Sequence, residues 1–132
     1  MATAETTTEH QAIERSVQLY IDGASKGDVA KLREAFHTDA WMFGSVSGAR
    51  FDIPISQMID MAASQPLDSD GTYKASIISI EQVGDAATAT IEEQGCWGGV
   101  SFVDFLALAK IDGAWKIVNK TFAHTGGEMP TA

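Results

Sequence analysis

The feature that most constrains the fold is a change in apolar spacing at Thr72. Before Thr72 apolar residues recur at helical intervals, and after it they alternate with polar residues, which is typical of strands. The alternating region divides into segments at about 72–83, 86–97, 100–111 and 114–123. The connectors between them are Gly84-Asp85, Gly98-Gly99 and Asp112-Gly113. Such pairs tolerate the positive φ angles of tight hairpins, so the pattern predicts four antiparallel strands joined in order.

The preceding part of the chain predicts about three helices. The first starts near Thr8, where Gln11 gives a weak capping box, and the others follow Gly27 and Pro54. Their apolar faces are Ile13, Val17, Tyr20 and Ala24, then Val29, Leu32 and Phe36, then Ile55, Met58, Ile59 and Ala62. The stretch 41–51 is a loop or one short hairpin, 1–8 a flexible arm and 125–132 a flexible tail. Helices followed by an antiparallel meander predict a single α+β domain over 1–132.

Composition limits the partners and the chemistry. The 18 acidic and 9 basic residues give a net charge of -9, which disfavours binding to nucleic acid or to an anionic membrane. The single cysteine, Cys96, excludes an intrachain disulfide and a cysteine-based zinc site. The sequence shows no phosphate loop, dinucleotide fingerprint or nucleophile motif, so we expect no cofactor and no metal. The first residues do not resemble a signal peptide, and we expect a cytoplasmic protein.

Two-residue turns also predict which strand residues lie opposite each other. Counting from the turns places Glu93 opposite Asp104, Asp104 opposite Thr121 and Leu106 opposite Asn119. One face then carries Ile78, Ile80, Ala89, Ile91, Leu106, Leu108, Trp115 and Ile117, and further along Ser76, Glu93, Asp104, Asn119 and Thr121. An apolar core that grades into convergent polar groups predicts a small-molecule pocket. A β-bulge would move every residue beyond it to the other face.

The opposite face is mixed in character and has enough apolar surface to favour a subunit contact. It includes Phe105, Val118, Lys120 and Phe122. We therefore expect a homodimer formed through the outer face of the sheet. Parity also places Cys96 off the core face, as a structural thiol, and His124 on the opposite face unless a bulge intervenes.

The acidic pair is the strongest chemical signal in the sequence. Direct cross-strand neighbours have Cβ atoms about 5 Å apart. Two ionised carboxylates at that distance repel by about 3 kcal/mol at an effective dielectric constant of about 20, or about two pKa units. One of Glu93 and Asp104 would then keep a proton at neutral pH, which supplies a general acid and a general base in one pocket. The alternative is that one side chain lies at the rim, or that a bulge separates the two.

Other residues are candidates for binding a ligand, each with a structural alternative. Tyr20 could donate a hydrogen bond to a substrate oxygen or be a core tyrosine. His37 could contact the ligand, or it could lie there because the dipole at the end of the second helix favours its cation. Trp41 and Trp97 could wall the mouth of the pocket or close the core. Ile59, Asn119 and Thr121 complete the candidate ligand-binding set.

Two segments resemble the nuclear transport factor 2-like superfamily and its "Putative lumazine-binding" branch. The first comprises Tyr20-Ile21-Asp22-Gly23, Lys26-Gly27-Asp28, Leu32 and Phe36-His37-Thr38-Asp39-Ala40, and the second runs from Asp104 to Lys120. The resemblance implies a cone, a curved sheet wrapped around helices with a deep pocket, and commonly a dimer. It also implies an oxyanion-binding role for Tyr20, as in the isomerases of the superfamily. Their catalytic base corresponds to Gly44, so the resemblance does not support steroid isomerase activity.

These features are compatible with three functions. In the first, an enzyme without a cofactor uses Asp104 or Glu93 to move a proton and Tyr20 to stabilise charge on oxygen, in isomerisation, dehydration or aldol-type cyclisation. In the second, a non-catalytic module binds an apolar or heteroaromatic molecule, which Asp104 and Asn119 orient. In the third, a dimerising domain keeps a vestigial pocket.

Overall fold

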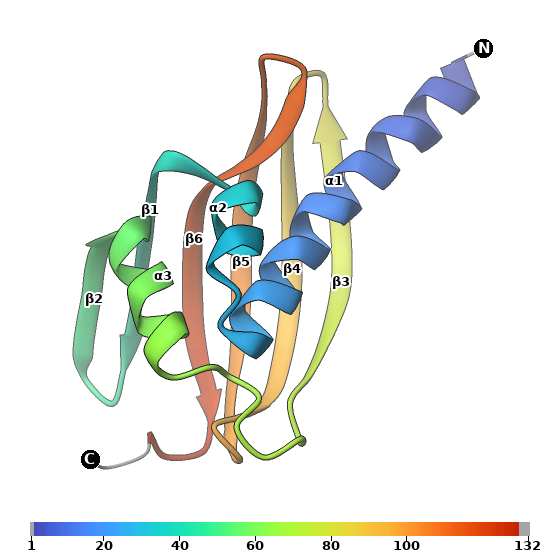
Figure 1. Ribbon diagram of the computed structural model, residues 1–132. Coiled ribbons are helices and arrows are strands. Elements are labelled where there is room, and N and C mark those ends of the chain that lie inside the picture. The colour runs from blue at the N-terminus through green and yellow to red at the C-terminus, as the bar shows by residue number, and fades with distance from the viewer. Residues whose placement is uncertain (1, 130–132) are drawn as a thin grey trace.

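The structure, a computed structural model, describes residues 2–129, with side chains from Thr8 onward. Figure 1 shows three helices packed on one face of a six-stranded sheet. The helices are α1 (Ala2–Lys26), α2 (Val29–Ala35) and α3 (Ile55–Ser64). The strands are β1 (Phe36–Val46), β2 (Ala49–Pro54), β3 (Lys74–Val83), β4 (Ala86–Cys96), β5 (Val100–Ile111) and β6 (Ala114–Gly126). The predicted α+β class is confirmed.

The strand order is β2-β1-β6-β5-β4-β3. The last four strands form the predicted meander, but the sheet is mixed, because β1 pairs in parallel with β6. Of the two readings of 41–51, the hairpin is confirmed, and it is longer than expected. Its first strand begins at Phe36, and its turn uses positive φ angles at Ser47 and Gly48.

The ends of the chain differ from the sequence expectation. The first helix begins at Ala2 rather than near Thr8, so the segment predicted as an arm is helical there. The last strand continues to Gly126, into the segment predicted as a tail. The flexibility of both segments stays a prediction, and positions 1 and 130–132 lie outside the described residues. Within the described part, no helix is both long and apolar enough to cross a membrane.

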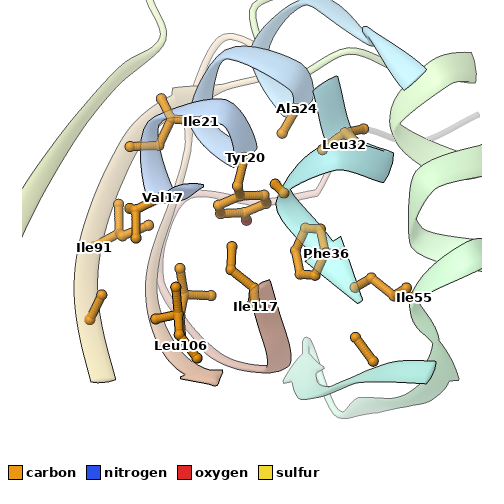
Figure 2. Close-up of a cluster of buried hydrophobic side chains, with 14 of the residues drawn as sticks. Val17, Tyr20, Ile21, Ala24, Leu32, Phe36, Ile55, Ile91, Leu106 and Ile117 are labelled. Atoms are coloured by element: carbon orange, nitrogen blue, oxygen red, sulfur yellow. The ribbon is translucent and has the colours of Figure 1, made fainter. Parts of the chain in front are cut away.

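The core lies between the helices and the inner face of the sheet (Figure 2). The predicted stripe of α1 faces the strands, and Ile13, Val17 and Tyr20 are fully buried. They pack with Ile91 and Ile117, which are also fully buried. Full burial of such a side chain contributes about 1.5–3 kcal/mol, so this layer supplies much of the stability.

The predicted register holds next to Gly84-Asp85 and Asp112-Gly113 and fails beyond a bulge further along each of the two ladders. Lys110 pairs with Trp115 and Leu108 with Ile117, as predicted. The ladder between β5 and β6 then shifts at Val118, so Leu106 pairs with Lys120 and Asp104 with Phe122. This turns Lys120 and Phe122 inward and moves Asn119 and Thr121 to the outer face. A second shift at Ile78 leaves Ile78 and Ser76 exposed, so their predicted place on the core face was wrong.

A third irregularity lies where β4 meets β5. The ladder shifts between Glu93 and Cys96, so Glu93 pairs with Phe102 and Asp104 with Ile91. The turn before it also takes three residues, 97–99, instead of the predicted two, so the pairing differs from the predicted one by two residues in all. Both carboxyls therefore stay on the inner face but are not directly opposite. Gly95 allows the shift in the ladder, because its φ is 69° and a Cβ there would collide with the backbone of Thr72. Cys96 turns inward and is fully buried, contrary to the parity prediction.

Candidate functional site

A pocket of about 120 Å³ opens between the inner face of the sheet, α3 and the 65–73 loop. Its walls come mainly from aromatic and methionine side chains, and its polar residues are few. The lining residues are Ala24, Met42, Val46, Phe51, Met58, Met61, Ala62, Gln65, Leu67, Glu93, Trp97, Phe102, Asp104, Lys120, Phe122 and Met129. An apolar cavity of about 150 Å³ binds benzene, so this pocket suits a compact, ring-sized molecule.

Two buried carboxyls form the polar end of the pocket. Asp104 and Glu93 are each 1% exposed. The Tyr20 hydroxyl donates a hydrogen bond of 2.6 Å to Asp104 Oδ2, and the Tyr73 hydroxyl donates one of 2.6 Å to Glu93 Oε2. Each carboxyl is thus fixed by a tyrosine from a different part of the chain.

Electrostatics separates the roles of the two carboxyls. Burial raises the pKa of Glu93 well above its usual value, and the charge of Asp104 raises it further. The charge of Lys120 and the Tyr73 hydrogen bond oppose this rise in pKa. Glu93 is therefore the carboxyl that keeps a proton. Burial raises the pKa of Tyr20 well above its usual value, and the charge of Asp104 raises it further, so its hydroxyl stays a donor.

One oxygen of this pair has no hydrogen-bond donor. Asp104 Oδ1 is buried and unpartnered among the described residues, and Asp104 lines the pocket. A buried acceptor left without a donor costs about 1–3 kcal/mol. The oxygen is therefore available to a group that enters the pocket.

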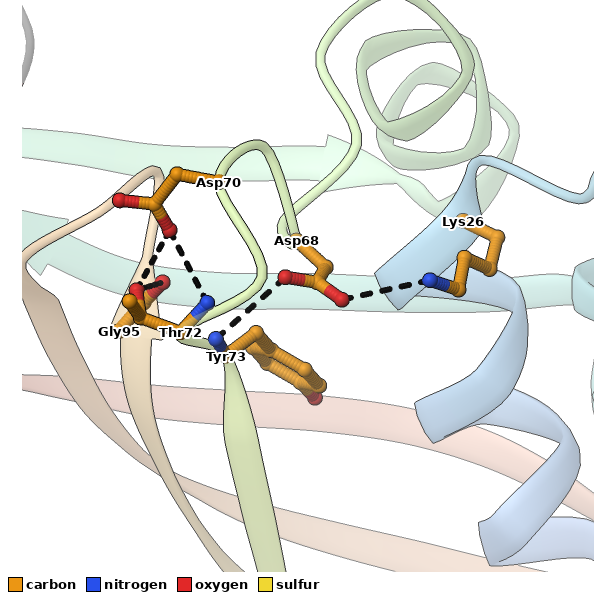
Figure 3. Close-up of polar contacts among 6 residues, drawn as sticks. All are labelled: Lys26, Asp68, Asp70, Thr72, Tyr73 and Gly95. Atoms are coloured by element: carbon orange, nitrogen blue, oxygen red, sulfur yellow. Dashed lines mark hydrogen bonds and ion pairs between the residues drawn. The ribbon is translucent and has the colours of Figure 1, made fainter.

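The 65–73 loop positions the second tyrosine (Figure 3). Asp68 joins Lys26 of α1 at 3.3 Å and accepts from the backbone N–H of Tyr73 at 3.5 Å. Asp70 accepts from the hydroxyl of Thr72 at 2.6 Å and from its backbone N–H at 3.1 Å. These contacts hold the chain next to Tyr73, whose hydroxyl reaches Glu93. Sequence reasoning missed Tyr73 because counting along the predicted 72–83 strand without the shift at Ile78 placed it on the outer face.

Lys120 is the second residue that sequence reasoning missed. Counting without the Val118 bulge placed it outside, whereas it lines the pocket with its Nζ 4.9 Å from the centroid of the Tyr20 ring. Phe122, misplaced for the same reason, fills the space beside Gly44. A Cβ on Gly44 would collide with the Phe122 ring, so this position has no room for the isomerase base.

The pocket includes some of the predicted site residues and not others. Asp104, Glu93 and Trp97 line it, and the Trp97 indole N–H donates to the Gln65 carbonyl at 3.1 Å. Tyr20 lies behind Asp104 with its hydroxyl already engaged. Ile59 is a core residue of α3, beside Met58, which lines the pocket.

Four predicted ligand-binding residues lie away from the pocket. The His37 ring accepts from the backbone N–H of Asp39 at 3.1 Å. The Trp41 indole points outward and donates to Asp52 at 2.6 Å. Thr121 donates to Asn119 at 2.8 Å on the outer face. Trp41 points outward because strand residues alternate and its neighbour Met42 points inward. Asn119 and Thr121 point outward because of the Val118 bulge.

Two further features complete the description of the site. Burial raises the pKa of the Cys96 thiol to about 12, so it is not a ready nucleophile. His124, which sequence parity placed outside, lies against the Phe102 ring, with centroids 5.7 Å apart. Within residues 2–129, no three His, Cys, Asp or Glu side chains are grouped so that they could hold a metal ion.

The fold and pocket define an NTF2-like protein. An NTF2-like protein of unknown function from Shewanella baltica superposes with a TM-score of 0.82 at 31% identity, over 92% of this chain and 97% of that one. One from Silicibacter pomeroyi gives a TM-score of 0.82 at 26% identity, over 91% and 98%.

Sequence comparison gives the family. The family model described as "Putative lumazine-binding" matches residues 8–123, and the chain belongs to this family. The curated protein "Aldolase FrzH" from Cladobotryum sp. is 30% identical over 122 residues, which cover 92% of this chain and 96% of that protein. The resemblances expected from the sequence are thereby confirmed at the level of superfamily and family.

Proposed function

We propose that the protein binds a small, mainly apolar carbonyl compound and moves a proton on it with the Asp104–Glu93 pair. The observation that carries the proposal is Asp104 Oδ1, a buried oxygen without a hydrogen-bond partner among the described residues, on a side chain that lines an apolar pocket. A carboxylate held away from water can remove a proton from the carbon next to a carbonyl group. Aldol-type chemistry is favoured because the relative named an aldolase matches nearly the whole chain.

The pair can complete an aldol addition with the one proton held by Glu93, because the proton that Asp104 removes replaces it. Asp104 removes a proton from the carbon next to the carbonyl of one reactant, which leaves an enolate. The enolate carbon forms a bond to the carbonyl carbon of the second reactant group, whose carbon–oxygen π bond breaks to give an alkoxide. Neutral Glu93 protonates the alkoxide, and the proton on Asp104 passes to Glu93. Both carboxyls line the same pocket, so that last transfer takes place within it.

Deuterium exchange tests the proton-transfer step without knowledge of the natural substrate. Small ketones and aldehydes are incubated with the protein in D₂O, and NMR follows deuterium incorporation next to the carbonyl. We expect Asp104→Asn to slow exchange by about 10²–10⁴-fold, the range of general base catalysis. Asp60→Asn, on the exposed side of α3, is the matched control and should leave the rate unchanged. Equal rates in Asp104→Asn and the wild type would contradict the proposal.

Binding without turnover is the second candidate function. The family description and the largely apolar pocket favour it. Native mass spectrometry of the freshly purified protein distinguishes the two: a bound molecule recovered unchanged after long incubation supports a binding module. Conversion of that molecule supports the enzyme.

We also propose a cytoplasmic homodimer that forms through the outer face of the sheet. Phe43 and Phe105 are 40% and 53% exposed, and both flank Thr121 in the ladder, so they form one row across three strands. The buried, unpaired Cys96 is in keeping with a reducing compartment. Sedimentation of the wild type and Phe105→Lys tests the interface: a dimer that becomes a monomer supports it, and a monomeric wild type contradicts it.

A further inference from the structure

Lys120 is the only cationic residue among the described residues that line the pocket. It stands half-buried on β6, turned inward by the Val118 bulge. The ion pairs found within residues 2–129 involve Lys26, Arg50 and Lys110, and none involves Lys120. In a chain with 18 acidic residues, a cation in a pocket without a direct ion pair is an unusual placement.

Two aromatic rings hold the ammonium group instead. Lys120 Nζ lies 4.9 Å from the centroid of the Tyr20 ring and 5.6 Å from that of Phe122. Cation–π contacts of this kind fix an ammonium group without neutralising its charge. The Tyr20 ring below it is the same ring whose hydroxyl fixes Asp104. Lys120 and Asp104 therefore line one pocket and contact the same tyrosine.

A cation and a base in this arrangement fit the two ends of an enolising group. When Asp104 removes a proton from carbon, negative charge develops on the neighbouring carbonyl oxygen. A fixed positive charge in a largely apolar pocket stabilises that charged oxygen more than it stabilises the neutral carbonyl of the ground state. The Tyr20 hydroxyl cannot serve in this way, because it already donates to Asp104.

We infer that Lys120 binds the substrate oxygen on which negative charge develops, and that the pocket selects planar compounds able to carry an anionic oxygen. Enolisable β-dicarbonyl compounds and hydroxylated aromatic rings are the chemical class that this describes. The inference rests on the proposed function, because it assigns a role within the same pocket.

Para-nitrophenol and nitrobenzene form a matched pair of probes, since they differ in the one ionisable oxygen. Binding of each is measured by calorimetry at weakly alkaline pH, where the phenol is ionised. For the wild type we expect the phenolate to bind about tenfold more tightly than nitrobenzene, the effect of one charge-assisted hydrogen bond. Absorbance of the bound phenol should also show its pKa lowered relative to Lys120→Met.

The variants separate the charge of Lys120 from the net charge of the protein. Lys120→Met should lose the preference for the phenolate, and Lys120→Arg should keep it. Lys31→Met, on the exposed face of α2, removes the same charge and should behave as the wild type. Circular dichroism shows whether each variant is folded. If Lys120→Met does not fold, Lys120→Arg is the variant used for the test. A phenolate preference that survives in Lys120→Met overturns the inference, whereas failure of both probes to bind contradicts the proposed pocket itself.

Discussion

The two ends of the inner sheet face differ in how they are built, although the same strands form both. The end next to Asp112-Gly113 is a regular ladder covered by apolar side chains such as Val17 and Ile117. The other end has shifted registers, two buried carboxyls and a pocket. The difference shows that bulges, rather than a change of strand, convert a closed core into a site with polar groups.

Truncation of a side chain should cost far more stability at the core end than at the pocket. Ile117→Ala should lower the free energy of unfolding by about 2–5 kcal/mol, because it leaves a cavity among fully buried neighbours. Met61→Ala, at a lining residue that is 46% exposed, should change it by no more than about 0.5 kcal/mol. Urea denaturation measures both, and similar losses would remove the distinction between the two ends.

Deletion of Val118 tests whether the bulge itself is needed at the pocket end. Without the extra residue, Asn119 follows Ile117 directly and still pairs with Ala107, so the ladder becomes regular while Lys120 and Phe122 stay inward. We therefore expect the deletion variant to keep phenolate binding and to lose no more than about 1 kcal/mol of unfolding free energy. Val118→Ala keeps the bulge and is the control. Loss of phenolate binding in the deletion variant alone would contradict this register.

The sequence predicted the core end better than the pocket end for a physical reason. Near the turns, alternation and two-residue loops determine the register, so Lys110, Leu108 and their partners were placed correctly. A bulge depends on the packing of distant segments, such as Thr72 against Gly95, which local patterns do not contain. The acidic pair was found despite this, because its register shift was even, whereas the odd shift at Val118 exchanged Lys120 and Phe122 for Asn119 and Thr121.

The raised pKa of Glu93 makes stability depend on pH in a defined direction. The folded protein holds the Glu93 proton to higher pH than the unfolded chain, whose glutamates titrate near 4.5. Stability from this proton is fully present below that pH and is lost as pH rises toward the folded pKa, by at most about 1.4 kcal/mol per pH unit. Glu93→Gln should remove this slope, and Glu92→Gln, on the outer face, should retain it. Identical slopes in all three proteins would contradict the assignment.

The smallest effect is expected at the loop that holds Tyr73. Asp68→Asn breaks an exposed ion pair with Lys26, so stability should fall by only about 0.2–1 kcal/mol. The slope of stability with pH should stay close to that of the wild type, because the Tyr73 hydroxyl still reaches Glu93. Thermal unfolding over a range of pH tests this, and a large loss of stability would show that the loop is part of the core.

The protonation state of Glu93 tests the account most directly. Carbon-13 NMR of the side-chain carboxyls at neutral pH should show one glutamate at the shift of the protonated acid. That signal should disappear in Glu93→Gln and persist in Glu92→Gln. A spectrum in which every glutamate is ionised at neutral pH would contradict the claim that the pocket holds one acid and one base.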